Sequence, residues 1–475
     1  MNKNIAIKNF DWLLLFLMLA LVFIGWINIY AATYNPDYPG LMNFESRAGK
    51  QFIWIIVGMV LLATILIIDS KFFSFIAYPL YGFSLLVLMS VFIFGKEING
   101  AKSWVDLGFL RIQPAEFTKI AVALVLAKYM GRHEFNVKDF KQLITTGLFL
   151  IIPVLLILLQ NDTGSALVFF AFMLVLYREG MQPVFLIVIA SLIVLFFLVL
   201  ILPKSLVILG IYFVFLLIYS LYERHKKNIL IVLAISIFIF LMWLSFFYFT
   251  GHPIHEKWFL ILFISLVSII IVLSVIVAIR RLFHFFPMLL ILLIFTGFIF
   301  VVDYAYHNIL EPHQQKRISI LLGLESDLKG AGYNVNQSKI SIGSGGFLGK
   351  GFLNGTQTKY DFVPEQSTDF IFCTIGEEWG FVGSTIFIII FVLLLWRIIV
   401  LAERQRSRFS RVYAYGVLSI LIFHFMLNIG MTIGLMPVIG IPLPFTSYGG
   451  SSLWTFIILL ALLLRFDMNR NEIIR

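Results

Sequence analysis

Residues 330–372 read GAGYNVNQSKISIGSGGFLGKGFLNGTQTKYDFVPEQSTDFIF and lie inside a polar stretch of a chain that is otherwise strongly apolar. The whole stretch runs from Tyr304 to Gly380 and holds eight of the 25 acidic residues. The segments on either side are rich in Leu, Ile, Val and Phe. The flanking segments are therefore suited to hydrocarbon, whereas the stretch itself is suited to water. It is the first place to look for function.

Composition places the chain among membrane proteins, because 61% of its 475 residues are hydrophobic and only 13% are charged. We count fourteen apolar runs of about 17 to 22 residues, each long enough to cross a hydrocarbon core of about 30 Å. They centre near residues 22, 60, 84, 122, 151, 171, 192, 213, 240, 269, 294, 391, 421 and 458. The sequence predicts an all-α polytopic membrane protein with about fourteen transmembrane helices.

Basic residues predict the orientation, since Lys and Arg accumulate in short cytoplasmic loops. With the N-terminus inside, the cytoplasmic segments hold 21 Lys and Arg residues, and the short outer loops hold seven. We therefore expect both termini in the cytoplasm and the long polar stretch on the outer face. The net charge of +10 is explained by this topology and by attraction to anionic membrane lipid, so nucleic acid is not an expected partner.

Two shorter polar blocks precede the long stretch. In the first, residues 99–119, Pro114 suits the first turn of a helix, and Glu116 and Lys119 share one face of it. They could form a structural ion pair or line a substrate cavity, and the spacing favours neither. In the second, residues 160–165, Asp162 is explained equally well as a helix cap and as a functional acid.

The segment 343–351, GSGGFLGKG, invites comparison with a phosphate-binding loop. A Walker A motif needs Gly six residues before its Lys and Ser or Thr after it, but Ser344 and Gly351 occupy these positions around Lys350. A nucleotide site is not expected. The glycines instead permit tight turns and close approach of the backbone to a ligand. Such backbone amides, with Lys350 or Lys339, could hold a diphosphate head group.

Seven acids of the stretch are candidates for catalysis: Glu325, Asp327, Asp361, Glu365, Asp369, Glu377 and Glu378. Asp327 is favoured because it lies in a short polar turn directly before the glycine-rich core. Glu377 and Glu378 precede Trp379 and Gly380 at an expected helix start, where acids favour the helix dipole. Spacing alone does not choose among them. Cys373 is the single cysteine, and no Cys or His cluster has metal-site spacing.

Several motifs occur together in a distinctive order. They are ESD and GAGY (325–333), QSKISIGSGG with GKG (337–351), GTQ (355–357), PE with TDFIF (364–372), IGEEWGFVG (375–383), NIGM (428–431) and GLMPVIGIPLPFTSYGGSS (434–452). In this combination the chain resembles the SEDS family of bacterial cell-wall polymerases. The triplet Gly355–Gln357 has the form of the elongation branch. The resemblance covers about residues 10–180 and 305–470, and the QPAEFTK block (113–119) and QNDTGSAL block (160–167) agree with it.

The resemblance implies a peptidoglycan glycosyltransferase that polymerises lipid II at the outer face of the bacterial cytoplasmic membrane during elongation and shape maintenance. The essential acid of the family maps onto Asp327, as the general base, and undecaprenyl diphosphate would leave. Positive side chains or a divalent cation, Mg or Mn, would stabilise the diphosphate, although no cofactor is certain. Implied partners are a class B penicillin-binding protein, other membrane proteins of the elongation complex and membrane lipid.

Further candidates would bind substrate. For the diphosphate they are Lys50, Arg111, Lys119, Lys339 and Lys350. The other candidate substrate-binding residues are Trp104, Glu116, Asp162, Gln337, Gln357, Glu365, Thr368, Asp369 and Ser447.

The chain departs from the family pattern in residues 204–286, since family members have ten spans and this chain has four more. The expected division is 1–203 for the N-terminal family-like helices, 204–286 for inserted helices, 287–303 for a leading helix, 304–381 for the outer catalytic loop and 382–475 for the C-terminal helices. Smaller departures are Leu324 and Leu328, where the family has prolines, Ser367 in place of a His, and Asn161. Two other functions stay open, a lipid II flippase and a non-enzymatic scaffold of the wall-synthesis complex.

Overall fold

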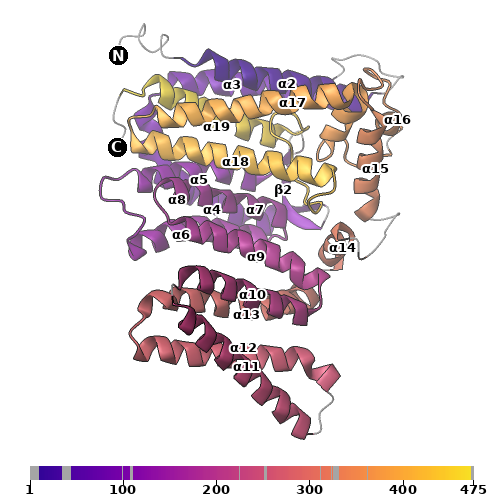
Figure 1. Cartoon of the computed structure of the whole chain (residues 1–475). Helices are drawn as coiled ribbons and strands as arrows, with labels where there is room; N and C mark the ends of the chain where they lie inside the picture. The colour runs from indigo at the N-terminus through magenta and orange to yellow at the C-terminus, as the bar shows by residue number, and fades with distance from the viewer. Residues whose placement is uncertain are drawn as a thin grey trace. The chain divides into compact units, whose positions relative to one another are not determined.

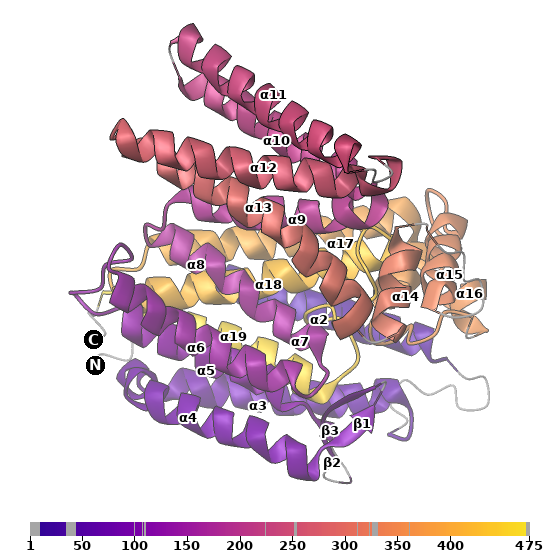
Figure 2. The same ribbon diagram turned by 90° about the horizontal axis from the view of Figure 1, so that it is seen from below.

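The computed structural model describes residues 10–34, 44–98, 100–106, 108, 111–223, 225–250, 254–310, 312–322, 324, 331–360 and 362–471. The chain forms two compact units. Unit 1 comprises residues 1–181 and 327–475, and unit 2 comprises residues 182–326. Figure 1 colours the chain from its N-terminus to its C-terminus, and Figure 2 gives a second view of each unit.

Unit 1 is a helical bundle with a small three-stranded antiparallel sheet. Its first part contains α2 (Trp12–Ala32), α3 (Arg47–Ile67), α4 (Ser70–Phe94), β1 (Lys96–Ile98), β2 (Ala101–Asp106), β3 (Arg111–Ile112), α5 (Pro114–Met130), α6 (Phe140–Leu158), α7 (Thr163–Val168), η1 (Phe169–Phe172) and α8 (Met173–Arg178). Its second part contains α15 (Ala331–Ser344), α16 (Thr356–Lys359), α17 (Ile371–Glu403), α18 (Arg408–Thr432) and α19 (Gly450–Met468).

Helix starts in unit 1 carry recognisable signals. Side chains of Asp11, Ser46, Asp69 and Asp139 each accept a backbone N–H of the first turn that follows, which satisfies a donor that the helix itself leaves unpaired. Helix α5 begins at Pro114, as its sequence predicts, because a residue at the first helical position needs no N–H.

The two parts of unit 1 pack against each other. Helix α3 lies along α19, and α2 lies along α17, as Figure 1 shows. Asp11, before α2, accepts from Arg397 of α17 at 2.6 Å and from Arg404 at 3.0 Å, and Arg404 also reaches Asp467 of α19. Because ionisable groups at the ends of spans are costly unless paired, this cluster ties three helices together at one end of the bundle.

The long polar stretch is more ordered than a loop. Its described residues contain α15 and α16, and they contain the first turns of α17, which begins at Ile371. Figure 1 shows α15 and α16 at the end of the unit 1 bundle where α17 begins. Helix α17 is bent at Gly380, whose φ of 62° is not helical. The described residues between 331 and 380 therefore form a compact cap on one end of the unit 1 bundle, whereas residues 304–326 belong to unit 2.

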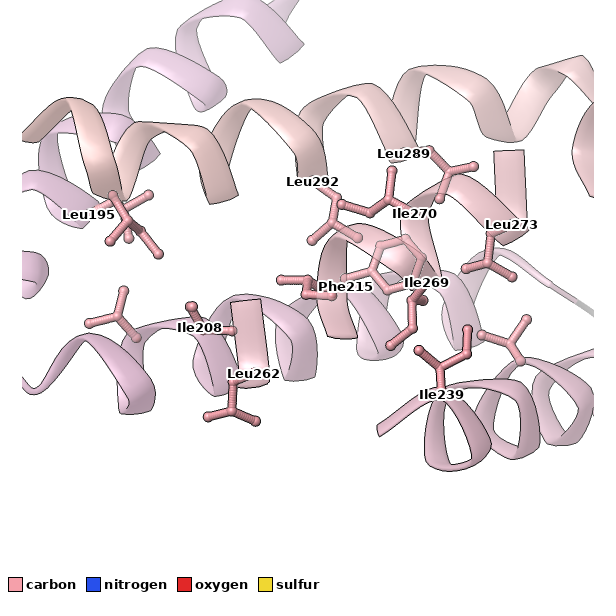
Figure 3. Packing of buried hydrophobic residues seen from close by; sticks show 14 of the residues in the cluster. Leu195, Ile208, Phe215, Ile239, Leu262, Ile269, Ile270, Leu273, Leu289 and Leu292 are labelled. Carbon is pink, nitrogen blue, oxygen red and sulfur yellow. The ribbon is translucent and has the colours of Figure 1, made fainter. Parts of the chain in front are cut away.

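Unit 2 consists of α9 (Pro183–Ile201), α10 (Lys204–Tyr222), α11 (Lys226–Phe249), α12 (Ile254–Ile279), η2 (Phe283–Phe285), α13 (Phe286–Tyr304), the π-helical turn η3 (Ala305–Ile309) and α14 (Pro312–Leu321). Its interior is one hydrophobic cluster drawn from α9 to α13. Figure 3 shows this packing, with Phe215 of α10, Leu273 of α12 and Leu289 of α13 among its members.

Twelve described helices are long and apolar enough to cross a membrane, and no membrane is present in the structure. The two remaining apolar runs also form helices, but shorter ones: α5 has 17 residues, and the run centred near residue 171 is divided into α7, η1 and α8. The helical, multi-pass character is confirmed. The count of fourteen crossings and the five-part division of the chain stay predictions.

Candidate active site

Glu377 is the centre of the polar cap. Its side chain is fully buried, and Lys350 donates to it at 2.7 Å. The backbone N–H groups of Gln357 and Thr358 donate to it at 2.9 and 3.0 Å, and the hydroxyl of Thr358 does so at 3.0 Å. Further donors are the hydroxyls of Thr356 and Ser341, both at 3.2 Å. These residues form the Glu377 cluster, in which a buried charge is paired and hydrogen-bonded on both oxygens.

Residues 346–351 supply hydrogen-bond partners to the backbone of α17 at its bend. Lys350 N–H donates to the carbonyl of Glu377, and Gly351 N–H donates to that of Glu378, each at 3.0 Å. In the other direction, Phe381 N–H donates to the carbonyl of Gly346 at 2.9 Å. The bend at Gly380 leaves these groups without helical partners, so the glycine-rich segment supplies them.

Glycine is required for this contact. A Cβ on Gly349 would lie 2.1 Å from the carbonyl oxygen of Glu378, and one on Gly380 would lie 2.3 Å from the N atom of Gly349. Both residues have positive φ. The glycines do permit close backbone approach, but the partner is α17 and not a bound ligand. Glu377 and Glu378 are buried in the last turn of α17 before its bend at Gly380, and their carboxylates contact this segment, so the helix-dipole role stays a prediction.

A second polar junction joins the start of α3 to the segments before α17 and α19. Arg47 donates to the Ser367 hydroxyl at 2.6 Å and lies over the Tyr448 ring. Tyr448 N–H donates to the Ser367 carbonyl at 2.8 Å. Ser447 donates to the Thr368 carbonyl at 2.5 Å. These four residues and Thr368 form the α3–α19 junction, where three segments distant in sequence meet.

Glu116 and Lys119 form the predicted ion pair at 2.8 Å, and both are buried. Lys119 also lies 2.9 Å from Nε2 of His424, and Nδ1 of that ring lies 3.1 Å from the Pro442 carbonyl. Since an ammonium only donates, the imidazole accepts at Nε2 and donates from Nδ1. The pair therefore links α5 to α18 and to the segment before α19, and the structural alternative for this pair is the one observed.

Asp162 caps α7. It accepts the backbone N–H of Ser165 at 3.0 Å, the hydroxyl of Ser165 at 2.9 Å and the amide of Gln113 at 2.7 Å. The capping alternative is thus observed, and the bond from Gln113 holds the starts of α5 and α7 together.

The predicted cations fall into two groups. Lys119 and Lys350 form ion pairs with buried carboxylates. Lys50 and Lys339 are exposed on α3 and α15, and Arg111 is exposed on β3, 3.6 Å from Asp106. Lys339 lies against Gly434, next to the end of α18. The exposed cations are the ones available to an anionic substrate.

Other predicted residues occupy varied positions. Trp104 is half-buried in β2, and Gln337 is half-buried in α15. Glu365 is exposed and accepts from the Thr368 hydroxyl at 3.0 Å. Asp369 is half-buried, and its carbonyl accepts from Asn428 at 2.8 Å. Asp327 lies outside the described residues, four positions before α15 begins.

Four residues that organise this end of the bundle were not among the predicted site residues, namely Arg47, Ser367, His424 and Asn428. Two of these residues could have been recognised in the sequence. His424 and Asn428 are polar residues inside an apolar run, which in a membrane helix indicates an interior position. Arg47 gave no such signal, because a basic residue before a span is ordinary.

The resemblance allows a divalent cation that would stabilise the charge of the diphosphate. In the ranges that the structure describes, no three His, Cys, Asp or Glu side chains gather closely enough to hold a metal. The described residues therefore do not fit a protein-only metal cage.

Comparison with known proteins gives the family. Residues 11–210 and 266–472 match the FtsW, RodA and SpoVE family, described as cell cycle proteins. The chain is 32% identical to the peptidoglycan glycosyltransferase RodA of Treponema pallidum over 473 residues, covering 97% of this chain and 98% of the relative. It is 30% identical to the peptidoglycan glycosyltransferase MrdB of Escherichia coli K12, covering 94% of this chain and 90% of the relative.

Solved structures agree on the fold. A chain from a peptidoglycan synthase complex that coordinates polymerization and crosslinking superposes with a TM-score of 0.63 at 25% identity, covering 98% of this chain and 99% of that one. RodA of Thermus thermophilus superposes with a TM-score of 0.56 at 23% identity, covering 98% of each chain. The predicted membership is confirmed, and the chain belongs to the SEDS family, the FtsW/RodA/SpoVE group of cell cycle proteins.

Proposed function

We propose that this protein polymerises lipid II into glycan strands at the outer face of the bacterial cytoplasmic membrane, with both of its termini in the cytoplasm. The class of activity follows from the family: the protein is a multi-pass membrane peptidoglycan glycosyltransferase of cell elongation. The proposal adds the substrate, the side of the membrane and the catalytic residue.

In the proposed reaction Asp327 is the general base. Its carboxylate takes the proton from the 4-hydroxyl of the GlcNAc unit on one lipid II while that oxygen attacks C1 of the sugar on the other. The bond from C1 to undecaprenyl diphosphate breaks, and the diphosphate leaves with the bonding electrons. Positioned proton transfer of this kind contributes about 10² to 10⁴-fold to a rate.

The Glu377 cluster is the observation that carries the proposal. It fixes residues 350–358 to α17 through buried bonds, and α15, which belongs to the same cap, begins four positions after Asp327. A catalytic acid gains from a rigid neighbourhood, because small displacements of a reacting group are costly in rate. Lys50, Arg111 and Lys339 are exposed and could attract the diphosphate, whereas Lys350 serves mainly to hold Glu377.

A class B penicillin-binding protein is the proposed partner. The support is the similarity to a chain from a synthase complex that couples polymerization to crosslinking. Other elongation-complex proteins follow from the same family context. A divalent cation bound chiefly through the oxygens of the diphosphate, as Mg²⁺ binds phosphates in other enzymes, remains part of the proposal.

The test is the purified full chain, reconstituted in liposomes with fluorescent lipid II, alone and with its crosslinking partner. We expect ladders of glycan chains. Movement of lipid II between leaflets without chain growth would favour a flippase, and neither activity, with or without the partner, would favour a scaffold. Either result would overturn the proposed reaction.

A further inference from the structure

Unit 2 contains a half-open cavity of about 290 Å³ at one end of α10, α11, α12 and α13. Its walls are apolar and come from all four helices, including Phe215, Val232, Leu273 and Leu289. Figure 3 shows Phe215, Leu273 and Leu289 within the same cluster. The cavity belongs to unit 2, whereas the described residues of the candidate active site belong to unit 1.

The mouth of the cavity is polar and basic. Asn228 and Arg280 line it, at the start of α11 and just after the end of α12. Lys226, Lys227 and Arg281 are exposed beside them in sequence. Among the described side chains here, Glu223 is the only carboxylate. Its pKa is lowered, chiefly by the backbone N–H of His225 that donates to it, and it also bonds to Asn228.

The polar and apolar parts are arranged as in a membrane leaflet. Helix α10 ends at Tyr222, α11 begins at Lys226 and α12 ends at Ile279, so the basic mouth lies at the ends of three spans. From Asn228 the cavity extends along α11 to Ile235, about 10 Å at 1.5 Å per residue. Basic residues at this level face the lipid headgroups, and the walls below them face the acyl chains.

We propose that this cavity binds one anionic glycerophospholipid, with an acyl chain between α11 and α12 and its phosphate beside Arg280. Charge complementarity favours this occupant, since Arg280 lines the mouth, and the helix ends beside it carry three further cations and one described carboxylate. Acyl chains match the apolar walls, and a phosphate matches a guanidinium at their edge. The bound lipid would then be a structural part of unit 2.

The proposal is tested on the full-length protein by native mass spectrometry, from micelles containing equal amounts of phosphatidylglycerol and phosphatidylcholine with the same acyl chains. We expect the wild type to retain one phosphatidylglycerol in preference. Arg280→Gln should weaken its retention about fivefold, the effect of one basic residue near an anionic surface. Lys257→Gln, which removes an exposed charge near the other end of α12, is the matched control and should have no effect.

A second pair of variants tests the cavity itself. Ile235→Phe fills the cavity and should remove retention of both lipids, whereas Ile237→Phe adds the same bulk to the exposed face of α11 and should not. Equal retention of the two lipids by the wild type would overturn the proposal. Equal effects of Arg280→Gln and Lys257→Gln would also overturn it, as would unchanged retention in a folded Ile235→Phe protein.

Discussion

The two units differ in whether their interiors contain charged side chains. In unit 1 buried carboxylates link the elements to one another. The Glu377 side chain is 0% exposed and accepts hydrogen bonds from six groups. Asp11 and Glu116 are also buried and paired with basic side chains. In unit 2 the interior is a single apolar cluster, and the ion pair Lys204–Asp303 is exposed by 38% and 37%. Geometry is specified by directional bonds in unit 1 and by side-chain packing in unit 2. The difference agrees with the proposed location of the chemistry in unit 1.

Breaking the Glu377 cluster should have the largest effect. In Glu377→Gln the amide NH₂ would face N–H donors of Gln357 or Thr358, and Lys350 would lose its counter-charge. We expect about a 100-fold loss of lipid II polymerisation, because the cap would shift relative to the site. The assay is glycan chain formation in liposomes, with limited proteolysis of residues 345–360 as a structural readout.

Glu378→Gln is the matched control for this change. Glu378 is also buried, but among the described residues its carboxylate accepts a hydrogen bond from Leu353 N–H alone, at 3.2 Å, and an amide oxygen can replace that acceptor. Activity should stay within about threefold of wild type. Equal losses in the two variants would show that burial alone, and not the bonding of Glu377, organises the cap.

Removing one partner of the α5 ion pair should have the next largest effect. Lys119→Met leaves the Glu116 carboxylate buried without its cation and should destabilise the protein by about 3 to 5 kcal/mol. Glu116→Gln/Lys119→Met removes both charges and should recover much of this loss. Denaturant unfolding in detergent compares them, and equal destabilisation of the single and double variants would exclude a penalty from the unpaired charge.

Acid should weaken the Asp11 cluster to a smaller extent. Burial raises the pKa of Asp11, but hydrogen bonds from Arg397 and Leu14 N–H and the charges of Arg397 and Arg404 outweigh it, so its pKa lies below the ordinary 3.8. A lowered pKa stabilises the fold above the unfolded value, and this contribution is lost as the pH falls through the folded value. The loss therefore begins below about pH 4.

The comparison for Asp11 is Asp69, an exposed N-cap that bonds only within its own helix start. Asp11→Asn should cost about 1 to 3 kcal/mol at neutral pH, and Asp69→Asn about 0.5 kcal/mol. Thermal unfolding at pH 7 and at about pH 3, below the unfolded pKa of an Asp, measures both. A wild type and an Asp11→Asn protein with identical stability at pH 7 would contradict the proposed ion-pair contribution.

The smallest effect is expected in unit 2. Asp303→Asn removes an ion pair that water already screens, so stability should change by less than about 1 kcal/mol. Polymerisation should be unchanged. A loss of activity as large as that of Glu377→Gln would mean that the division of roles between the units is wrong.

The sequence predicted the class of fold well, because every apolar run that we counted forms a helix. Pro114 and Asp162 marked helix starts through local chemistry that a single chain displays. The order of the cap was not predictable. Its glycines indicate close approach, but they do not say that the partner would be the bent backbone of α17 near Gly380.

The candidate site was predicted in part. Glu116 with Lys119 is a local pair, so its spacing of three residues revealed it. Glu377 accepts bonds from residues 19 to 36 positions away, and Arg47 donates to Ser367, 320 positions away. Such contacts depend on how helices assemble. Sequence position alone therefore did not reveal the partners of Glu377 and left Arg47 out.

The most direct test of the central claim, that the polar cap of unit 1 performs glycosyl transfer, is the rate of glycan chain formation by purified Asp327→Asn protein. We predict a loss of about 10² to 10⁴-fold, the usual contribution of a general base, with wild-type unfolding and an unchanged proteolytic pattern for the cap. Chain formation at the wild-type rate by the substituted protein would contradict the account.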